Sequence, residues 1–529
     1  MSPLLILALF LPFQAVPSEK CSLSGTVVDS VTGEPLNKVE LQLEPLYRQA
    51  THVAVTTSDG QGRFAMVDLD PGRYRLKGKR TGYLEMSYGA RRPNSDGILV
   101  QLDVGQAVKD LKFKLMPSAV IAGTVRDSDG EPLEDAHVIL ARFTYEYGSP
   151  GVEGLNSTHT DDRGEYRFSK LGPGKYYVGG EPRSNEWDQV DHSANGGPTE
   201  TSVPTLYPGV TDVATGAPIE VSTGRNVTGV DVTLLRSRVF RVSGRVVNGR
   251  VTGGLTAELH DAKNAGMRDY DLRTSPKSGN GDFEFRGVPP GSYELTVSGQ
   301  SLHSKTSVTV GGSDVEGIRV TLAPGAQVKL RIVTEGAAKP DLSGLDFFLT
   351  ANGGRSGPGS SPFEAERLIV RNVPPDHYAF KLFGGLPREF YVKSARAGEI
   401  DVMADGLTVA GAGTIDIEIV LASDGGGVEG AVLDKNRQPV AGATVLLAPD
   451  RRSRADLFKS TTSDQHGHYE FTAITPGDYK LFAWEDVEPN SWNDPGFLKD
   501  YEKQSEKTTL RPKTRATVNL HLATGPDAQ

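Results

Sequence analysis

The residues best suited to metal chemistry lie in one short turn. In "DQHGHYEF", Asp464, His466 and His468 could supply part of a zinc site. A zinc site needs three or four convergent ligands, and the related turns elsewhere in the chain carry Gln61 and Arg163 instead. We therefore interpret both histidines as solvated turn residues, and the sequence predicts neither a metal site nor a cofactor.

The motifs of common hydrolases are absent from the sequence. His-x-x-Glu and His-Glu-x-x-His, which supply zinc ligands in peptidases, do not occur, and neither does Gly-x-Ser-x-Gly or Gly-x-x-x-x-Gly-Lys-[Ser/Thr]. The only cysteine, Cys21, lies beside an apolar N-terminal segment, so no internal disulfide can form. The sequence therefore predicts that the protein is not an enzyme.

Two stretches have the composition of a carbohydrate site, in which exposed flat aromatics stack on sugar faces and amides or carboxylates bind the hydroxyl groups. They are "EPRSNEWDQVDHSANGG" (181–197) and "AWEDVEPNSWNDPGFLKDY" (483–501). The candidate ligand-binding residues are Trp187, Trp484, Trp492 and Tyr501. Two interpretations stay open: these rings bind a ligand from variable loops, or they pack their own loops onto the fold, which is the commoner situation for Trp.

One pattern of turn and strand residues recurs along the chain. A Gly before an aromatic pair is followed by Pro after nine residues, and by Tyr three residues later. The copies begin at Gly62, Gly164, Gly281 and Gly467, and a degraded copy keeps Pro375 and Tyr378 with Glu366 in place of Gly. The predicted turn and core residues are Pro71, Gly72, Tyr74, Pro173, Gly174, Tyr176, Pro290, Gly291, Tyr293, Pro476, Gly477 and Tyr479. Pro-Gly suits the central positions of a type II turn.

Apolar and polar residues alternate with period two on both sides of this turn. Phe64 and Met66 share one face, as do Ile415, Ile417 and Ile419 in a closing strand. Such alternation marks strands that are buried on one face, as in an antiparallel sandwich. The sequence predicts an all-β, tandem array of about five antiparallel β-sandwich domains. Their predicted ranges are 22–116, 119–236 with a long F–G loop, 239–323, a degenerate 326–422, and 427–524.

The N-terminus and the net charge bear on location and partners. The apolar run from Leu4 to Phe13 is too short to span a membrane, so residues 1–18 are predicted to be a signal peptide and the mature chain to have no membrane span. The formal net charge is −10, which provides no basic surface for nucleic acid. We expect an exported protein located in the periplasm, on the outer surface or outside the cell.

The assembled pattern, G-x-V-x-D, then G-E-P-L, D-x-x-G-x-[FY] and P-G-x-Y, resembles the carboxypeptidase regulatory-like domain family. The resemblance implies transthyretin-like sandwiches of Ig type, similar to the B-type repeats of Gram-positive collagen adhesins and to the carbohydrate-binding-like fold. The ranges 22–116, 119–236 and 427–524 match well. The third range lacks the Pro-Leu element, and the fourth keeps only Pro-x-x-Tyr.

These observations predict a non-catalytic protein with a structural, adhesive or ligand-binding role at the bacterial envelope. The expected partners are polysaccharide or envelope proteins. One alternative is a carbohydrate-binding protein that uses the loop aromatics. Another is an accessory subunit of a separately encoded peptidase.

Overall fold

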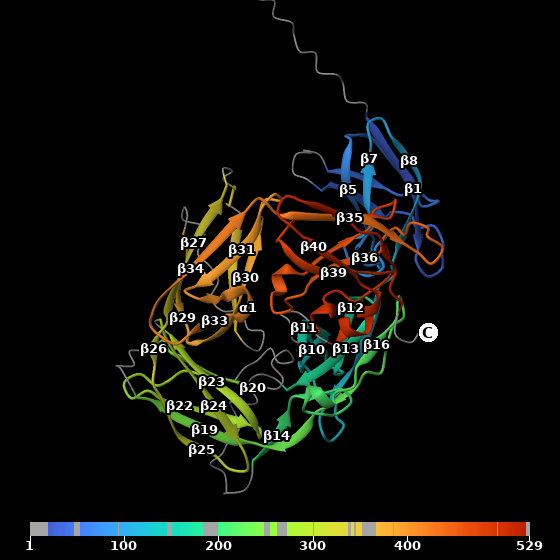
Figure 1. Cartoon of the computed structure of the whole chain (residues 1–529). Coiled ribbons are helices and arrows are strands. Elements are labelled where there is room, and N and C mark those ends of the chain that lie inside the picture. Colours follow the sequence, from blue (N-terminus) through green and yellow to red (C-terminus); the bar gives the residue numbers. More distant parts are fainter. Residues whose placement is uncertain are drawn as a thin grey trace, which may run out of the picture. The chain divides into compact units, whose positions relative to one another are not determined.

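The computed structural model describes most of the chain (Figure 1). The described residues are 20–46, 53–93, 95–144, 151–182, 199–247, 254–261, 272–299, 301–336, 340–342, 345–351, 367–384, 386–494 and 496–524. The chain divides into two compact units, residues 1–116 and 117–529. The predicted signal peptide lies outside the described residues.

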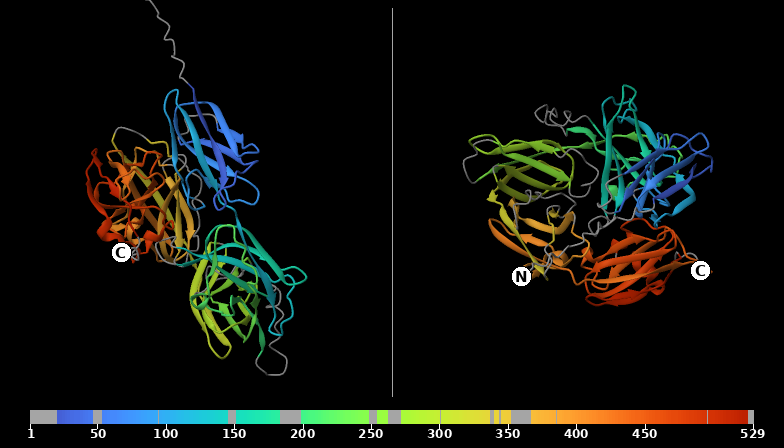
Figure 2. Two further views of the ribbon diagram at one scale, coloured as in Figure 1. Left: turned by 90° about the vertical axis from the view of Figure 1, so that its right-hand side faces the viewer. Right: turned by 90° about the horizontal axis from the view of Figure 1, so that it is seen from above.

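The first unit is a β-sandwich, whose packed sheets are seen in blue in Figure 2. One sheet has the strand order β4-β1-β8, and the other has the order β3-β2-β5-β6 with β7 also paired to β5. The strands are β1 (Cys21–Asp29), β2 (Glu40–Pro45), β3 (Ala54–Thr57), β4 (Arg63–Leu69), β5 (Gly72–Lys79), β6 (Met86–Ser87), β7 (Leu99–Leu102) and β8 (Ala107–Leu115). Leu23, Leu76 and Phe113 are fully buried between the two sheets.

The second unit repeats this plan around further hydrophobic cores. The second sandwich contains β9 (Ala119–Arg126), β10 (His137–Thr144), β11 (Gly151–His159), β12 (Glu165–Leu171), β13 (Gly174–Glu181), β14 (Glu200–Val203), β15 (Thr205–Leu206), the 3₁₀ helix η2 (Val213–Thr215), β16 (Ile219–Val221), β17 (Val232–Thr233) and β18 (Leu235–Arg238). The third contains β19 (Phe240–Val246), β20 (Thr256–Asp261), β21 (Leu272–Thr274), β22 (Asp282–Val288), β23 (Gly291–Gly299), β24 (Leu302–Val310), β25 (Val315–Val320) and β26 (Ala323–Pro324).

The fourth and fifth sandwiches complete the second unit. The fourth contains β27 (Ala326–Glu335), β28 (Leu345–Ala351), β29 (Arg367–Val373), β30 (Asp376–Gly384), β31 (Tyr391–Ala397), β32 (Ile400–Asp401), α1 (Val402–Asp405), β33 (Leu407–Val409) and β34 (Gly413–Ala422). The fifth contains β35 (Gly426–Leu433), β36 (Thr444–Pro449), η3 (Ala455–Leu457), β37 (Lys459–Thr462), β38 (His468–Ile474), β39 (Gly477–Trp484), η4 (Ser491–Asn493), η5 (Phe497–Gln504), β40 (Glu506–Leu510), β41 (Arg515–Thr517) and β42 (Leu520–His521).

The predicted all-β architecture is confirmed, with one correction to its strand directions. In every sandwich the opening strand pairs in parallel with the closing strand: β1 with β8, β9 with β17, β19 with β25, β27 with β34, and β35 with β41 and β42. A parallel pair needs a long connection. Here the intervening strands of the sandwich form that long connection. The alternation of apolar and polar residues along a single strand does not reveal whether its partner is parallel or antiparallel.

The glycine of the opening strand permits this close approach. A Cβ atom built on Gly25 would collide with the backbone carbonyl oxygen of Leu111 in the closing strand. The same collision arises in the fifth sandwich, between Gly430 and the carbonyl oxygen of Val518. The Gly of the G-x-V element in the opening strand is therefore required by the close packing of the parallel pair.

Candidate functional site

The Pro-Gly-x-Tyr motif forms the corner at which the chain leaves one sheet and enters the other. In the first sandwich, β4 belongs to the sheet of β1 whereas β5 belongs to the sheet of β2. Beyond each corner the Tyr hydroxyl donates a hydrogen bond to the carbonyl oxygen four residues earlier. These corner tyrosines and their acceptors are Tyr74 to Asp70 (2.7 Å), Tyr176 to Gly172 (2.9 Å), Tyr293 to Pro289 (2.8 Å), Tyr378 to Pro374 (2.9 Å) and Tyr479 to Thr475 (2.7 Å).

The predicted type II turn is wrong, although the connection is tight. A type II turn needs φ near +80° at the Gly, but Gly72 and Gly174 have φ of 159° and 158°, and Asp376 occupies this position in the fourth copy. The left-handed residue lies three positions before the Pro: Asp68, Lys170, Gly287, Asn372 and Ala473, with φ between 51° and 69°. The left-handed residue lies at a β-bulge before the Pro, where the register shifts and pairing then resumes for one more residue, as at Leu69 opposite Cys21.

Other repeated polar groups are also engaged within their own sandwich. The Asp464 carboxylate accepts hydrogen bonds from the backbone amides of His466 (2.8 Å) and His468 (2.9 Å). His466 lies on the turn that this carboxylate closes, and the exposed His468 begins β38. No cluster of three potential metal ligands occurs among the described residues.

A buried hydroxyl directly before this turn escaped the sequence analysis. Ser463 accepts a hydrogen bond from the Ala443 amide (2.9 Å) and donates to the Val440 carbonyl (2.7 Å). Ser58 and Thr160 make the equivalent pairs of bonds in the first and second sandwiches. The available signal was a Ser or Thr before Asp in "SDGQG", "TDDRG" and "SDQHG".

The predicted aromatic stretch of the fifth sandwich forms a second small core. Trp484 is 3% exposed and Trp492 is 8% exposed. The Trp484 ring stacks on Phe482 with a centroid distance of 5.4 Å and meets the partly buried Tyr501 edge-on at 5.5 Å. Because a sugar platform needs an exposed ring face, these indoles act here as anchors of the insertion that carries η4 and η5.

The long connection of the second sandwich folds back in a similar way. Leu206 and Val210 pack with Ala141 and Tyr177 on β10 and β13. β15 and β16 both pair with β13, so two short segments of the predicted long F–G loop are strand. Trp187 lies outside the described residues, and its ligand-binding role stays a prediction.

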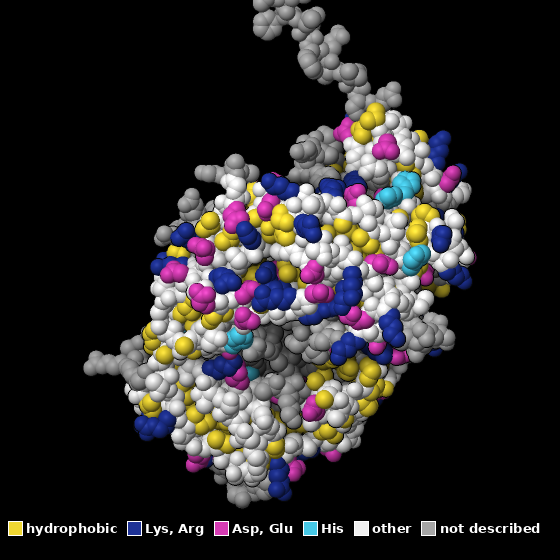
Figure 3. All heavy atoms as spheres, viewed as in Figure 1, with side chains coloured by type: hydrophobic (Ala, Val, Ile, Leu, Met, Phe, Trp, Pro, Cys, Tyr) yellow, Lys and Arg dark blue, Asp and Glu magenta, His cyan; other side chains and the backbone are white. Residues whose placement is uncertain are grey.

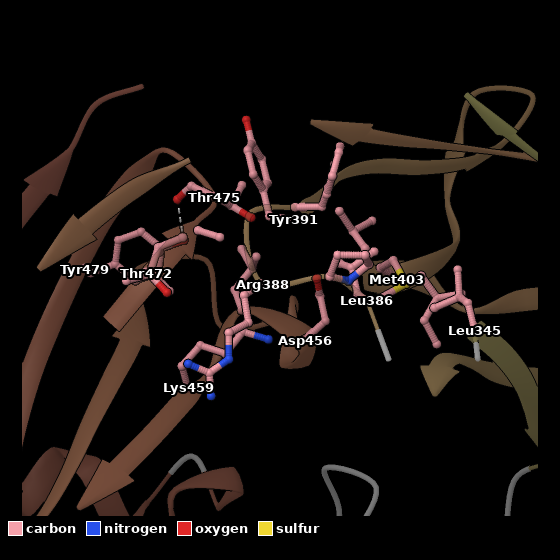
Figure 4. A pocket seen from close by; sticks show the side chains of 17 residues that line it. Leu345, Leu386, Arg388, Tyr391, Met403, Asp456, Lys459, Thr472, Thr475 and Tyr479 are labelled. Atoms are coloured by element: carbon pink, nitrogen blue, oxygen red, sulfur yellow. Dashed lines mark hydrogen bonds between the residues drawn. The ribbon is translucent and has the colours of Figure 1, made fainter. Parts of the chain in front are cut away.

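A cavity of about 380 Å³ lies between the fourth and fifth sandwiches (Figure 4). The fourth sandwich contributes Leu345, Leu386 and Met403, which form an apolar side to the right in Figure 4. The fifth contributes Thr472 and Thr475 to the left. The cavity therefore has chemically different sides.

Charged side chains line the middle of this cavity. They are Arg388 from the fourth sandwich, and Asp456 and Lys459 from the fifth (Figure 4). Desolvation by the walls lowers the pKa of the Lys459 ammonium, while Asp456 acts in the opposite direction. Lys459 nevertheless keeps much accessible surface, because the cavity that crowds its ammonium is open to solvent.

An ion-pair network lies beside the cavity and joins its two walls. The buried Arg454 guanidinium donates from Nε and from one terminal nitrogen to the two Asp456 oxygens, at 2.7 Å each. Another Arg454 nitrogen lies 3.5 Å from an Asp401 oxygen of the fourth sandwich, and Arg451 lies 3.4 Å from that oxygen. The hydrogen bonds to Asp456 are the leading cause that raises the Arg454 pKa.

The fold and these sites define a protein of tandem β-sandwiches. Residues 22–115, 120–179 and 427–523 match the sequence profile of the carboxypeptidase regulatory-like domain family. This match confirms the resemblance for the first and fifth ranges and for the N-terminal part of the second. No curated protein matches the chain.

Several bacterial proteins, among them pilins, appear among the similar solved structures. The Bacillus anthracis TIE protein shares 13% identity over 57% of this chain and 51% of its own, with a TM-score of 0.18. The chain thus spans about half the length of that protein. The Streptococcal ancillary pilin shares 13% identity over 57% of this chain and 99% of its own (TM-score 0.19). GBS52, a minor pilin of Streptococcus agalactiae, shares 15% sequence identity over 41% of this chain and 95% of its own, with a TM-score of 0.23. At these TM-scores the similarities carry no functional argument.

Proposed function

We propose that this protein is an exported, non-catalytic array of β-sandwiches with a structural or adhesive role at the bacterial envelope. The observation that carries the proposal is that the repeated polar groups make hydrogen bonds within their own sandwich. In every sandwich the corner Tyr hydroxyl is used in a hydrogen bond to its own corner. The repeated pattern therefore encodes folding, whereas a repeated catalytic signature would point its polar groups at a substrate.

The surface and the N-terminus support the same proposal. On the face in Figure 3, basic and acidic side chains are interspersed. Within the described ranges no helix is both long and apolar enough to cross a membrane. The apolar run from Leu4 to Phe13 has the length of a signal core. Export followed by association with other envelope components is consistent with these features.

Bacterial fractionation tests the proposal directly. The full chain is expressed with a C-terminal epitope, its mature N-terminus is sequenced, and the purified mature protein is incubated with isolated envelopes. We expect removal of about the first 18 residues, recovery outside the cytoplasm and co-sedimentation with envelopes. The matched variant Leu7→Arg interrupts the apolar run and should keep the protein inside. Cytoplasmic retention of an unprocessed wild-type chain, or no co-sedimentation, would refute the proposal.

A further inference from the structure

We propose that the cavity between the fourth and fifth sandwiches binds a small amphipathic anion, with Lys459 and Arg388 at its charged end. The ligand class is an organic acid, a carboxylate or sulfonate carried on an apolar group. This inference concerns a ligand site and does not depend on the proposed location or structural role.

The size and position of the cavity suit a small ligand. Its volume of about 380 Å³ falls within the range of roughly 300–1,000 Å³ found for small-molecule sites, which often lie between domains. The pairing of Asp401 with Arg454 and Arg451 ties the two walls together beside it. The walls are therefore held by contacts that a ligand would not need to supply.

The charge of the lining favours an anion. Arg388 and Lys459 are basic, and Asp456 is the acidic residue of the lining. Both Asp456 oxygens already accept hydrogen bonds from Arg454. Lys459 makes no ion pair within 4 Å in the described part of the chain. An incoming carboxylate would supply the partner that this ammonium lacks.

Lys459 is also a departure from the other sandwiches at the same register position. It lies opposite Leu447 at the start of β37. The equivalent residues are Ala54, Asn156 and Leu272, each opposite the corresponding leucine of its own sheet. Since these residues are uncharged, the fold does not require a cation at this position.

The apolar side of the cavity selects the remainder of the ligand. Leu345, Leu386 and Met403 lie together at one end, across from the threonines of the fifth sandwich (Figure 4). A hydrocarbon or aromatic group there would leave water while its acidic group remained near Lys459. A fully hydrophilic anion, such as free phosphate, would leave this apolar side without a partner.

Two naphthalene probes separate the charge from the apolar group. 1-Anilinonaphthalene-8-sulfonate is an amphipathic anion, and N-phenyl-1-naphthylamine has the same rings without the sulfonate. Fluorescence titration of the whole mature chain should show saturable binding of the anionic probe. Decanoate should displace it at lower concentrations than decanol does.

Substitutions then locate the site. Lys459→Gln should weaken binding of the sulfonate about tenfold or more, in line with a lost charge-assisted hydrogen bond, and leave the neutral probe within twofold. Lys459→Arg should retain sulfonate binding. Met403→Trp should reduce binding of both probes by filling the apolar end. The control Lys499→Gln, at an exposed lysine outside the lining, should change neither.

Three results would overturn the proposal. They are the absence of saturable sulfonate binding, a Lys459→Gln affinity within twofold of wild type, and an equal loss of both probes in Lys459→Gln. Circular dichroism of each variant checks folding. If Lys459→Gln does not fold, Arg388→Gln and Lys459→Arg decide the question, because the first should weaken sulfonate binding and the second should preserve it.

Discussion

Removal of one corner hydroxyl provides the sharpest test of the fold. Tyr479 is 2% exposed, and its hydroxyl donates to the Thr475 carbonyl at 2.7 Å. Tyr479→Phe keeps the ring and removes the donor. A typical hydrogen bond contributes about 0.5–1.5 kcal/mol net, and a buried group left unpaired costs about 1–3 kcal/mol. We therefore expect the fifth sandwich to lose about 1–2 kcal/mol of its free energy of unfolding.

Hydrogen exchange in the whole chain measures this loss locally. A change of 1–2 kcal/mol corresponds to roughly 5–30-fold faster exchange of the most protected amides, here those of β36 and β39, while peptides of the other sandwiches should be unchanged. Tyr501→Phe is the control in the same sandwich, because no hydrogen bond of its hydroxyl is present among the described residues. If Tyr479→Phe changes exchange by less than twofold, or no more than Tyr501→Phe does, the corner bond does not stabilise the sandwich.

Three further predictions concern other parts of the chain. Gly25→Ala should destabilise the first sandwich by about 1–3 kcal/mol, as overpacking does. In the control Gly60→Ala the added Cβ atom meets no atom within 4 Å, so the free energy of unfolding should change by under about 1 kcal/mol. Urea denaturation of both variants measures the difference. Burial raises the pKa of the corner phenols in the first, second, fourth and fifth sandwiches. The contribution of these neutral phenols to the free energy of unfolding is therefore complete below the unfolded-state pKa of about 10, and it is lost as the pH rises above that pKa. Absorbance at alkaline pH should show tyrosinate forming together with unfolding. Gradual ionisation of the folded protein would contradict this. Cys21 is 2% exposed and donates to the Asp103 carbonyl, so a thiol reagent should label the chain only when the first sandwich unfolds, and rapid labelling of native protein would disprove it.

The sequence was informative wherever the same physical requirement recurs in several copies. The spacing from Gly62 to Tyr74 placed an aromatic residue in the core beyond a tight connection, and Tyr74 is indeed 4% exposed. The left-handed position before the corner could not be found in this way. Five different residue types occupy it, from Asp68 to Ala473, so no composition marks the bend.

The role of the tryptophans could have been judged better from the strands beneath them. A platform and an anchor have the same local composition, and the difference is whether the underlying sheet has an apolar outer face. β36 reads "TVLLAP" and β39 ends in "LFAW", so both lack the polar positions that alternate in β4. Phe482 and Trp484 accordingly form part of the outer face of that sheet, and Trp492 and Leu498 of the insertion pack on it. A sheet that is apolar on both faces requires a cover, and the aromatic insertion supplies it.

The cavity could not have been predicted from sequence, because its walls come from separate repeats. Arg388 follows β30, whereas Lys459 begins β37, and nothing in either local sequence indicates the other. This contrast suggests where to look for function in tandem sandwiches. Residues that recur in register serve the sandwich itself, so the informative residues are those that break the register. Lys459 is such a residue: it introduces charge where three other sandwiches have none, and it does so in a cavity between two sandwiches.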